Sequence, residues 1–154
     1  MTEERPYKVF KIKEGVAIDH IPAGKALRVV SVLGLDRDLG EGIITLGMNL
    51  ESKKMEKKDV VKIENKKLTK DDLNKIALIG PRASVNIIHD GHVVEKVDIE
   101  IPDEFHNLVK CPNPKCITRN DDLDTLFFTK ARDPLRLKCH YCERVFDRED
   151  VDLL

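Results

Sequence analysis

Four cysteines lie as two close pairs in the carboxyl-terminal third of the chain. Cys111 and Cys116 have four residues between them, and Cys139 and Cys142 have two. Two pairs of thiolates, each presented on a tight turn, are the usual ligand set of a tetrahedral zinc ion. Four thiolates fill the coordination shell and leave no position for water. The spacing therefore predicts one structural Zn2+ ion per chain rather than a catalytic one.

The cysteine pattern is compatible with two other chemistries. The pair in CHYC could be a redox pair, although its flanks indicate two short strands about a turn instead of the strand-helix setting of thioredoxin. Four cysteines could also hold iron, as in rubredoxin. His106 and His140 are nearby in the sequence. With four cysteines present, we expect both histidines to lie outside the ligand shell.

Short segments with alternating apolar and polar residues surround these cysteines. The stretches TLFFTKARDPLRLKC and CERVFDREDVDLL are typical of antiparallel strands joined by turns. A module of this size builds only a small apolar core, so a metal would supply much of its folding free energy. We expect a small all-β zinc-binding domain over residues 104–154. Its expected core is Phe127, Phe128, Leu135, Leu137, Val145 and Phe146.

The preceding part of the chain, residues 1–103, shows strand and helix patterns in turn. A strand that enters a loop is expected over 7–21. A helix follows with Pro22 in its first turn, because proline fits that position. Two strands are expected next, over 43–52 and 57–68. One half-buried face of the first of these strands is expected to carry Ile44, Leu46, Met48 and Leu50.

A second helix and a hairpin complete this part. The helix begins after Thr69, which forms a capping box with Asp72, and it ends at Gly80 before Pro81. The hairpin has Asp90-Gly91 in its turn. The order strand, helix, two strands, helix and hairpin predicts a ferredoxin-like domain with its helices on one face of the sheet. The fold class expected for the whole chain is α+β.

Composition and charge narrow the function classes. The chain has 154 residues, of which 36% are charged, and a net charge of −1. Residues 1–103 carry 18 basic and 18 acidic side chains, and the remainder carries 9 and 10. This balance argues against a general nucleic-acid binder. The charged start MTEERPYK and the absence of a long apolar run predict a cytoplasmic protein with no membrane partner.

No enzymatic motif is recognisable in residues 1–103. The sequence lacks a phosphate loop, a dinucleotide-binding glycine fingerprint and a nucleophile elbow. Asp19 and His20 are adjacent, but neighbouring side chains on an extended segment point apart. Lys62 lies between Val61 and Ile63 in a lysine-rich stretch. These residues indicate either a solvated surface or a site for phosphates. Because no catalytic motif is recognisable, we expect a protein that is not itself an enzyme.

Motifs along nearly the whole chain resemble a known family. The chain is similar to the regulatory chain of aspartate carbamoyltransferase, an enzyme of pyrimidine biosynthesis. The matching segments, in order, are KEGVAIDHIPAG, ITLGMNL, KKDVVKIEN, SVN, VVEK, CPNPKCI and LKCHYCE. The resemblance implies an allosteric nucleotide-binding domain over 1–103 and a zinc domain over 104–154 that contacts the catalytic chain. It also implies regulatory homodimers that join two catalytic trimers into a dodecamer.

The resemblance also assigns roles to individual residues. It implies that CTP or ATP binds with Asp19 at the ribose, and with His20, Lys62 and Lys96 at the phosphates. The backbone near Ile12 would meet the base. The full expected nucleotide-binding set is Val9, Ile12, Asp19, His20, Val60, Lys62, Asn86, Ile88, Val93 and Lys96. The chain has Gly91 where the family's best-studied members place an aromatic residue near the base.

Two other functions fit part of the pattern. A zinc-ribbon accessory protein would bind nucleic acid through a basic, aromatic-bearing strand face, and its binding would weaken steeply with salt. A small electron carrier would hold iron on the four cysteines and would be coloured.

Overall fold

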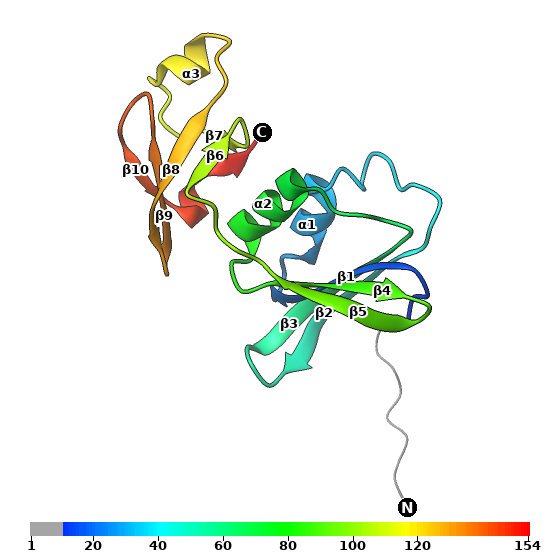
Figure 1. Ribbon diagram of the computed structural model, residues 1–154. Helices are drawn as coiled ribbons and strands as arrows, with labels where there is room; N and C mark the ends of the chain where they lie inside the picture. The colour runs from blue at the N-terminus through cyan, green and yellow to red at the C-terminus, as the bar shows by residue number, and fades with distance from the viewer. Residues whose placement is uncertain (1–10) are drawn as a thin grey trace, which may run out of the picture. The chain divides into compact units, whose positions relative to one another are not determined.

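The computed structural model describes residues 11–154, drawn in colour in Figure 1. The chain divides into two compact units, one that ends at Ile99 and one that comprises Glu100–Leu154. This division falls a few residues before the boundary expected after residue 103. No helix in the described range 11–154 is long and apolar enough to cross a membrane.

The first unit contains a five-stranded antiparallel sheet with the strand order β2-β3-β1-β4-β5. Strand β3 lies between β1 and β2, as in the ferredoxin-like plan, and β5 extends the sheet beyond β4. The predicted α+β class is therefore confirmed. The elements are β1 Gly15–Pro22, α1 Ala26–Val32, β2 Ile44–Ser52, β3 Glu56–Glu64, α2 Lys70–Ile79, β4 Ser84–His89 and β5 His92–Asp98.

Helices α1 and α2 lie on the same face of this sheet (Figure 1). The strand side chains toward them are apolar and buried, among them Ile18 and Val61. Helix α2 begins with the predicted capping box. The Thr69 hydroxyl accepts the N–H of Asp72 at 3.1 Å, and the Asp72 carboxylate accepts the N–H of Thr69 at 2.9 Å. The predicted stop at Gly80 is also confirmed. We call the other side of the sheet the open face.

Two expectations about this unit are wrong in detail. Pro22 is the last residue of β1 and does not belong to the first helical turn, because α1 begins only at Ala26. The apolar side of β2 is less buried than expected, with Leu46 and Met48 39% and 41% exposed. Strand β2 is at the edge of the sheet, and the register shifts between Gly47 and Leu50, which interrupts its alternation.

The second unit is built from short strands. A four-stranded sheet has the order β10-β9-β8-β6, and β11 pairs with β7 in a separate ribbon. The unit was predicted to be all-β, and it consists mostly of strands; the only α-helix described in it, α3, has four residues. The elements are β6 Glu104–His106, β7 Val109–Lys110, α3 Ile117–Asn120, β8 Leu126–Arg132, β9 Leu135–Cys139, β10 Val145–Asp147, the 3-10 helix Arg148–Asp150 and β11 Asp152–Leu153.

The core of the second unit agrees only partly with the prediction. Phe127, Leu135 and Leu137 are buried as expected. Val145 is 39% exposed, because β10 is the edge strand of its sheet. Residues outside the predicted core set complete the core instead, namely Phe105, Leu108, Val109 and Val151.

Candidate functional site

The four cysteines of the second unit meet at one point. Their sulfur atoms all lie within 4.8 Å of one another, and all four thiols are free of disulfides. The Cys111 and Cys142 sulfurs are 3.8 Å apart, as are those of Cys116 and Cys139. A tetrahedral zinc ion with Zn–S bonds of about 2.3 Å requires sulfur–sulfur distances of about 3.8 Å. The donor set and its spacing therefore suit a metal ion.

Local structure aims the first pair of cysteines. Cys111 follows β7, and Cys116 is the residue immediately before α3. The Arg119 guanidinium donates to the carbonyl of Cys111 at 2.8 Å, which ties α3 to the start of the loop. The Thr118 hydroxyl lies 3.1 Å from the Cys116 sulfur. These contacts hold the loop that carries Cys111 and Cys116 in shape.

The second pair lies in the turn between β9 and β10. Cys139 ends β9, and its carbonyl accepts the N–H of Glu143 at 3.0 Å, which closes the turn that carries Cys142. Burial raises the pKa of the Cys139 thiol. Burial also acts on Cys116, but hydrogen bonds from Thr118 outweigh it and lower the pKa of that thiol to about 7. His140 is exposed and faces the ring of Phe128, with ring centroids 5.7 Å apart, rather than joining the sulfur cluster.

In the first unit, three predicted nucleotide-binding residues form a row across the sheet together with Ala17. Ala17 of β1 pairs with Lys62 of β3 on one side and with Asn86 of β4 on the other. Asn86 in turn pairs with Lys96 of β5. Residues directly opposite each other on antiparallel strands present their side chains on the same face. Lys62, Asn86 and Lys96 therefore share the open face, since the neighbouring Val61 is buried toward the helices.

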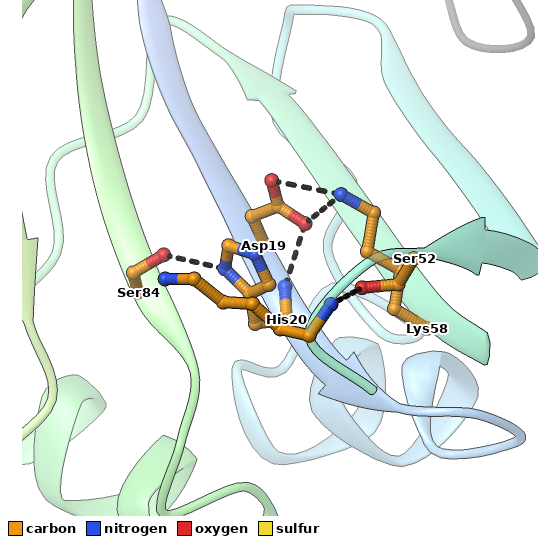
Figure 2. Close-up of polar contacts among 6 residues, drawn as sticks. Asp19, His20, Ser52, Lys58 and Ser84 are labelled. Atoms are coloured by element: carbon orange, nitrogen blue, oxygen red, sulfur yellow. Dashed lines mark hydrogen bonds and ion pairs between the residues drawn. The ribbon is translucent and has the colours of Figure 1, made fainter. Parts of the chain in front are cut away.

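A β-bulge brings Asp19 and His20 onto this same face. Ile18 pairs with Val61 and Ile21 with Asp59, so two residues of β1 oppose the single residue Val60. His20 has a φ of +57°, the left-handed conformation. The expectation that adjacent side chains point apart is thus wrong here. Figure 2 shows the two side chains together, with Ser84 beside the His20 ring and Lys58 beside the Asp19 carboxylate.

The contacts within this cluster are short. The Lys58 ammonium lies 2.9 Å from the Asp19 carboxylate, and the backbone N–H of His20 donates to the same carboxylate at 2.6 Å. The His20 Nδ1 atom is 3.2 Å from the Ser84 hydroxyl. One carboxylate is therefore surrounded by basic groups, and the cluster has positive charge in excess.

Electrostatics follow from this geometry. Burial raises the pKa of Asp19, but the hydrogen bonds from Lys58 and from the His20 N–H outweigh it, so the pKa is lowered overall. Burial lowers the pKa of His20; Asp19 opposes this, and the charges of Lys58, Lys54 and Lys96 reinforce it. Burial also lowers the pKa of Lys62. Such a set of cations attracts an anion that can replace the water lost by burial.

Sequence reasoning missed Lys58 and Lys54. Both belong to the lysine-rich stretch in which the sequence singles out Lys62 alone as a candidate for phosphate binding. Lys58 lies four residues before Lys62 on β3, and residues at even separation on a strand face the same way. The signal was therefore present in the alternation of the strand.

The remaining predicted residues have different positions. Val60 opposes the bulge and is buried. Ile88 and Val93 pair with each other two residues beyond Asn86 on β4, after a register shift between β4 and β5. Ile12 is buried and precedes β1. Val9 lies outside the described residues.

A cavity of about 630 Å³ lies on the other side of the sheet. It is lined by Val16, Val85 and Ile87 from the strands and by Leu73 from α2. Among the predicted nucleotide-binding residues that the structure describes, only Ile88 also lines it. The cavity is thus separate from the charged cluster of the open face.

Comparison with known proteins identifies both units. Residues 7–100 match the family model for the aspartate carbamoyltransferase regulatory chain, allosteric domain, and residues 103–152 match the model for the metal binding domain of that chain. The chain belongs to the family of aspartate carbamoyltransferase regulatory chains. A regulatory chain is a non-catalytic subunit, so the expected absence of catalytic residues agrees with its family.

Similar curated proteins carry the same name. The regulatory chain of Pyrococcus abyssi is 47% identical over 144 residues, which cover 94% of this chain and 95% of that one. The regulatory chain of Pyrococcus furiosus is 48% identical over 144 residues, with the same coverage. The regulatory chain of Bacteroides fragilis is 44% identical over 147 residues, which cover 96% of this chain and 95% of that one.

Proposed function

We propose that the open face of the first unit binds a nucleoside triphosphate of the CTP or ATP type. The observation that carries this proposal is the bulge that turns Asp19 and His20 onto the face occupied by Lys62, Asn86 and Lys96. A triphosphate needs several cations spread over one surface, and lysine supplies compact, mobile ones.

Each residue has a distinct role in the proposed complex. Asp19 accepts hydrogen bonds from the ribose hydroxyls, and His20 with Lys62 and Lys96 holds the phosphates. Asn86 supplies both a donor and an acceptor beside the cations. Val60, Ile88, Val93 and the backbone near Ile12 and Val9 would complete the pocket around the base. Lys58 pairs with Asp19 in the free chain and becomes available to phosphate when the ribose takes its place.

The second unit is proposed to hold zinc. Cys111, Cys116, Cys139 and Cys142 would bind the ion, which would serve as a structural cross-link between two turns. The sulfur spacing supports a tetrahedral metal. Elemental analysis of the purified chain tests the identity of the metal, since one zinc per chain is expected and a coloured, iron-containing protein would contradict it.

We further propose that the zinc domain contacts the catalytic chain and that two regulatory chains pair. Pairing is supported by the edge strand β2, whose unpaired backbone lies beside exposed Ile43, Leu46 and Met48. Exposed apolar edge strands invite association. In the full assembly, three such dimers would join two catalytic trimers in the cytoplasm. Sedimentation of the isolated chain tests the dimer.

Regulation would follow from linkage. A nucleotide changes the activity of the catalytic chain only if its affinity differs between two states of the assembly. The nucleotide would act on the first unit and the catalytic chain on the second, so the coupling must pass through the chain between them.

Calorimetry of the zinc-loaded chain with CTP and with ATP tests nucleotide binding. Replacing Lys96 by alanine should weaken binding by about tenfold, because one charge-assisted contact to phosphate is lost. Lys70→Ala is the matched control, since Lys70 is exposed at the start of α2, on the helix-covered side. No saturable binding of either nucleotide to the wild-type chain would refute the proposal. Equal affinities for wild type and Lys96→Ala would remove Lys96 from the site.

A further inference from the structure

Asp59 is a fully buried carboxylate that belongs to neither proposed site. Its side chain has 0% exposure. One oxygen, Oδ2, accepts the backbone N–H groups of Gly24 at 2.8 Å and Ala26 at 2.9 Å. The other, Oδ1, accepts the backbone N–H of Asn49 at 2.8 Å. Three separate backbone donors on one buried carboxylate require an explanation beyond packing.

These donors mark the places where the sheet departs from regular pairing. Asn49 lies in the bulge of β2, where Met48 and Asn49 oppose Asp59 alone. Gly24 lies in the turn between β1 and α1 and Ala26 is the first residue of α1, both a few residues after the bulge that contains Asp19 and His20. Bulges and helix starts leave N–H groups without ladder or intrahelical partners. Asp59 accepts N–H groups from the bulge of β2 and from the segment that follows β1.

The two bulges flank adjacent positions of β3. The β1 bulge opposes Val60, and the β2 bulge opposes Asp59. His20 has the left-handed backbone conformation, with a φ of +57°, which a non-glycine residue keeps only when its surroundings fix it. Asp59 anchors the chain a few residues after His20 by holding Gly24 and Ala26 to β3. This anchor favours the bulged course of β1 that keeps the side chains of Asp19 and His20 on one face.

We propose that Asp59 is the positioning residue of the nucleotide site: it holds the β1 bulge that turns Asp19 and His20 onto the open face and ties this bulge to the one on edge strand β2. This inference rests on the proposed nucleotide-binding function for its effect on affinity. The claim that Asp59 holds the two bulges concerns the conformation at His20 and Asn49, and it can be tested without a nucleotide.

The chemistry requires a carboxylate at this position. An asparagine has a single acceptor oxygen and an amide group that donates. In Asp59→Asn, the side chain can accept either from Asn49 or from Gly24 and Ala26, and its amide must then face the other N–H. One of the two bulges therefore loses its tie, while the volume of the side chain is unchanged.

The test uses Asp59→Asn in the full, zinc-loaded chain. Asp71→Asn is the matched control, because Asp71 is an exposed carboxylate in the first turn of α2. Calorimetry with CTP and ATP should show about tenfold weaker binding in Asp59→Asn, the effect of losing a buried hydrogen bond to a charged group. NMR titration of the His20 ring is the second readout. Its pKa should move up toward the ordinary value as the ring gains solvent.

Each result decides the proposal. Weaker binding together with the moved His20 titration supports it. Unchanged binding, or weaker binding with the wild-type His20 titration, overturns it, because a purely structural role would leave the ring as it is. If the wild-type chain binds neither nucleotide, the proposed function fails, and the His20 titration alone decides whether Asp59 positions the bulge.

A measurement on the wild-type chain covers the case in which Asp59→Asn does not fold. Hydrogen exchange of the N–H groups of Gly24, Ala26 and Asn49 is followed with and without nucleotide. Because one carboxylate holds all three, bound nucleotide should slow their exchange together, including Asn49 on the edge strand. Protection confined to Gly24 and Ala26, with Asn49 unaffected, overturns the tie between the two bulges.

Discussion

The two units bring the side chains of their candidate sites together by different means. In the second unit, two tight turns each carry a pair of cysteines that is visible in the sequence as a short spacing, and the two pairs meet with sulfur–sulfur distances of 3.8 Å between them. In the first unit, the residues of the cluster around Asp19 come from four strands, β1, β3, β4 and β5, and do not form one short sequence motif. A local motif appears in the sequence as spacing, whereas a face assembled from several strands appears only once their register is known.

The same contrast predicts how each site fails. The four cysteines act as one unit, because an ion held by three sulfurs has lost its closed shell. The open face distributes its contacts, so the loss of one cation leaves the others in place. Substitutions should therefore act in an all-or-none manner in the second unit and by degrees in the first.

Cys142→Ser gives the largest expected effect. The second unit should lose its metal and most of its ordered structure, because structural zinc supplies on the order of 10 kcal/mol of folding free energy in small modules. Metal analysis and capture of the catalytic chain measure the loss, and nucleotide calorimetry should remain near the wild-type result. His140→Ala is the control, since His140 lies between the cysteines in sequence but outside the cluster. A normal assembly formed by Cys142→Ser would contradict the closed four-cysteine site.

A pH series on nucleotide affinity gives an intermediate effect. Burial holds the pKa of His20 below its ordinary value, so the ring is largely neutral in the free chain at neutral pH. Phosphate favours the charged imidazolium, and binding therefore takes up a proton. Affinity should rise as the pH falls, and it should level off below the lowered pKa of His20.

The comparison variant for this series is His20→Gln. Protonation of the phosphate itself contributes the same pH dependence to both proteins, so the difference between their calorimetric profiles isolates the ring. The stability of the first unit should move in the opposite sense. Because the folded chain binds this proton less readily than the unfolded chain, stability is lost as the pH falls below about 6.5. Identical profiles for the two proteins would show that His20 does not meet phosphate.

Thr69→Ala gives the smallest expected effect and separates fold from function. The Thr69 hydroxyl caps α2 on the helix-covered side of the sheet, so its loss should lower the free energy of unfolding by about 1 kcal/mol. Urea unfolding followed by circular dichroism measures this change. Thr69→Ser retains the hydroxyl and should behave as wild type. Metal content and nucleotide affinity should not change, and a change in either would mean that the two sites depend on the helix more than their geometry indicates.

The sequence was sufficient for features whose causes are local. The cysteine spacing, the Thr69–Asp72 capping box and the Asp90-Gly91 turn each depend on a few consecutive residues, and the structure contains all three. The order of strands and helices followed from their periodicities. The cysteine cluster was therefore predictable as a set, even though the expected core wrongly included Val145 and lacked Phe105, Leu108, Val109 and Val151.

Features caused by distant residues were not predictable in the same way. Alternation along β1 predicts that Asp19 and His20 point apart, and the bulge reverses this. The carboxylate beside that bulge, Asp59, holds Gly24 from 35 residues further along the chain. Alternation along β3 places Lys58 on the face of Lys62, but its contact with Asp19 of β1 depends on the register of the two strands. The resemblance to a family supplied the residues of the open face, but the register of the sheet supplies the physical reason that they meet.

Strand β3 carries two sets of residues in strict alternation. Lys58, Val60 and Lys62 belong to the open face, while Asp59, Val61 and Ile63 are directed toward the helices. A substitution affects one set and leaves the other where it was. A one-residue deletion at Val60 would turn Lys58 and Asp59 to the opposite faces relative to Val61 and Lys62, because the side-chain period of a strand is two. It would bury a lysine and expose the carboxylate that holds both bulges. The length of β3 is therefore more tightly constrained than the identity of any single residue in it.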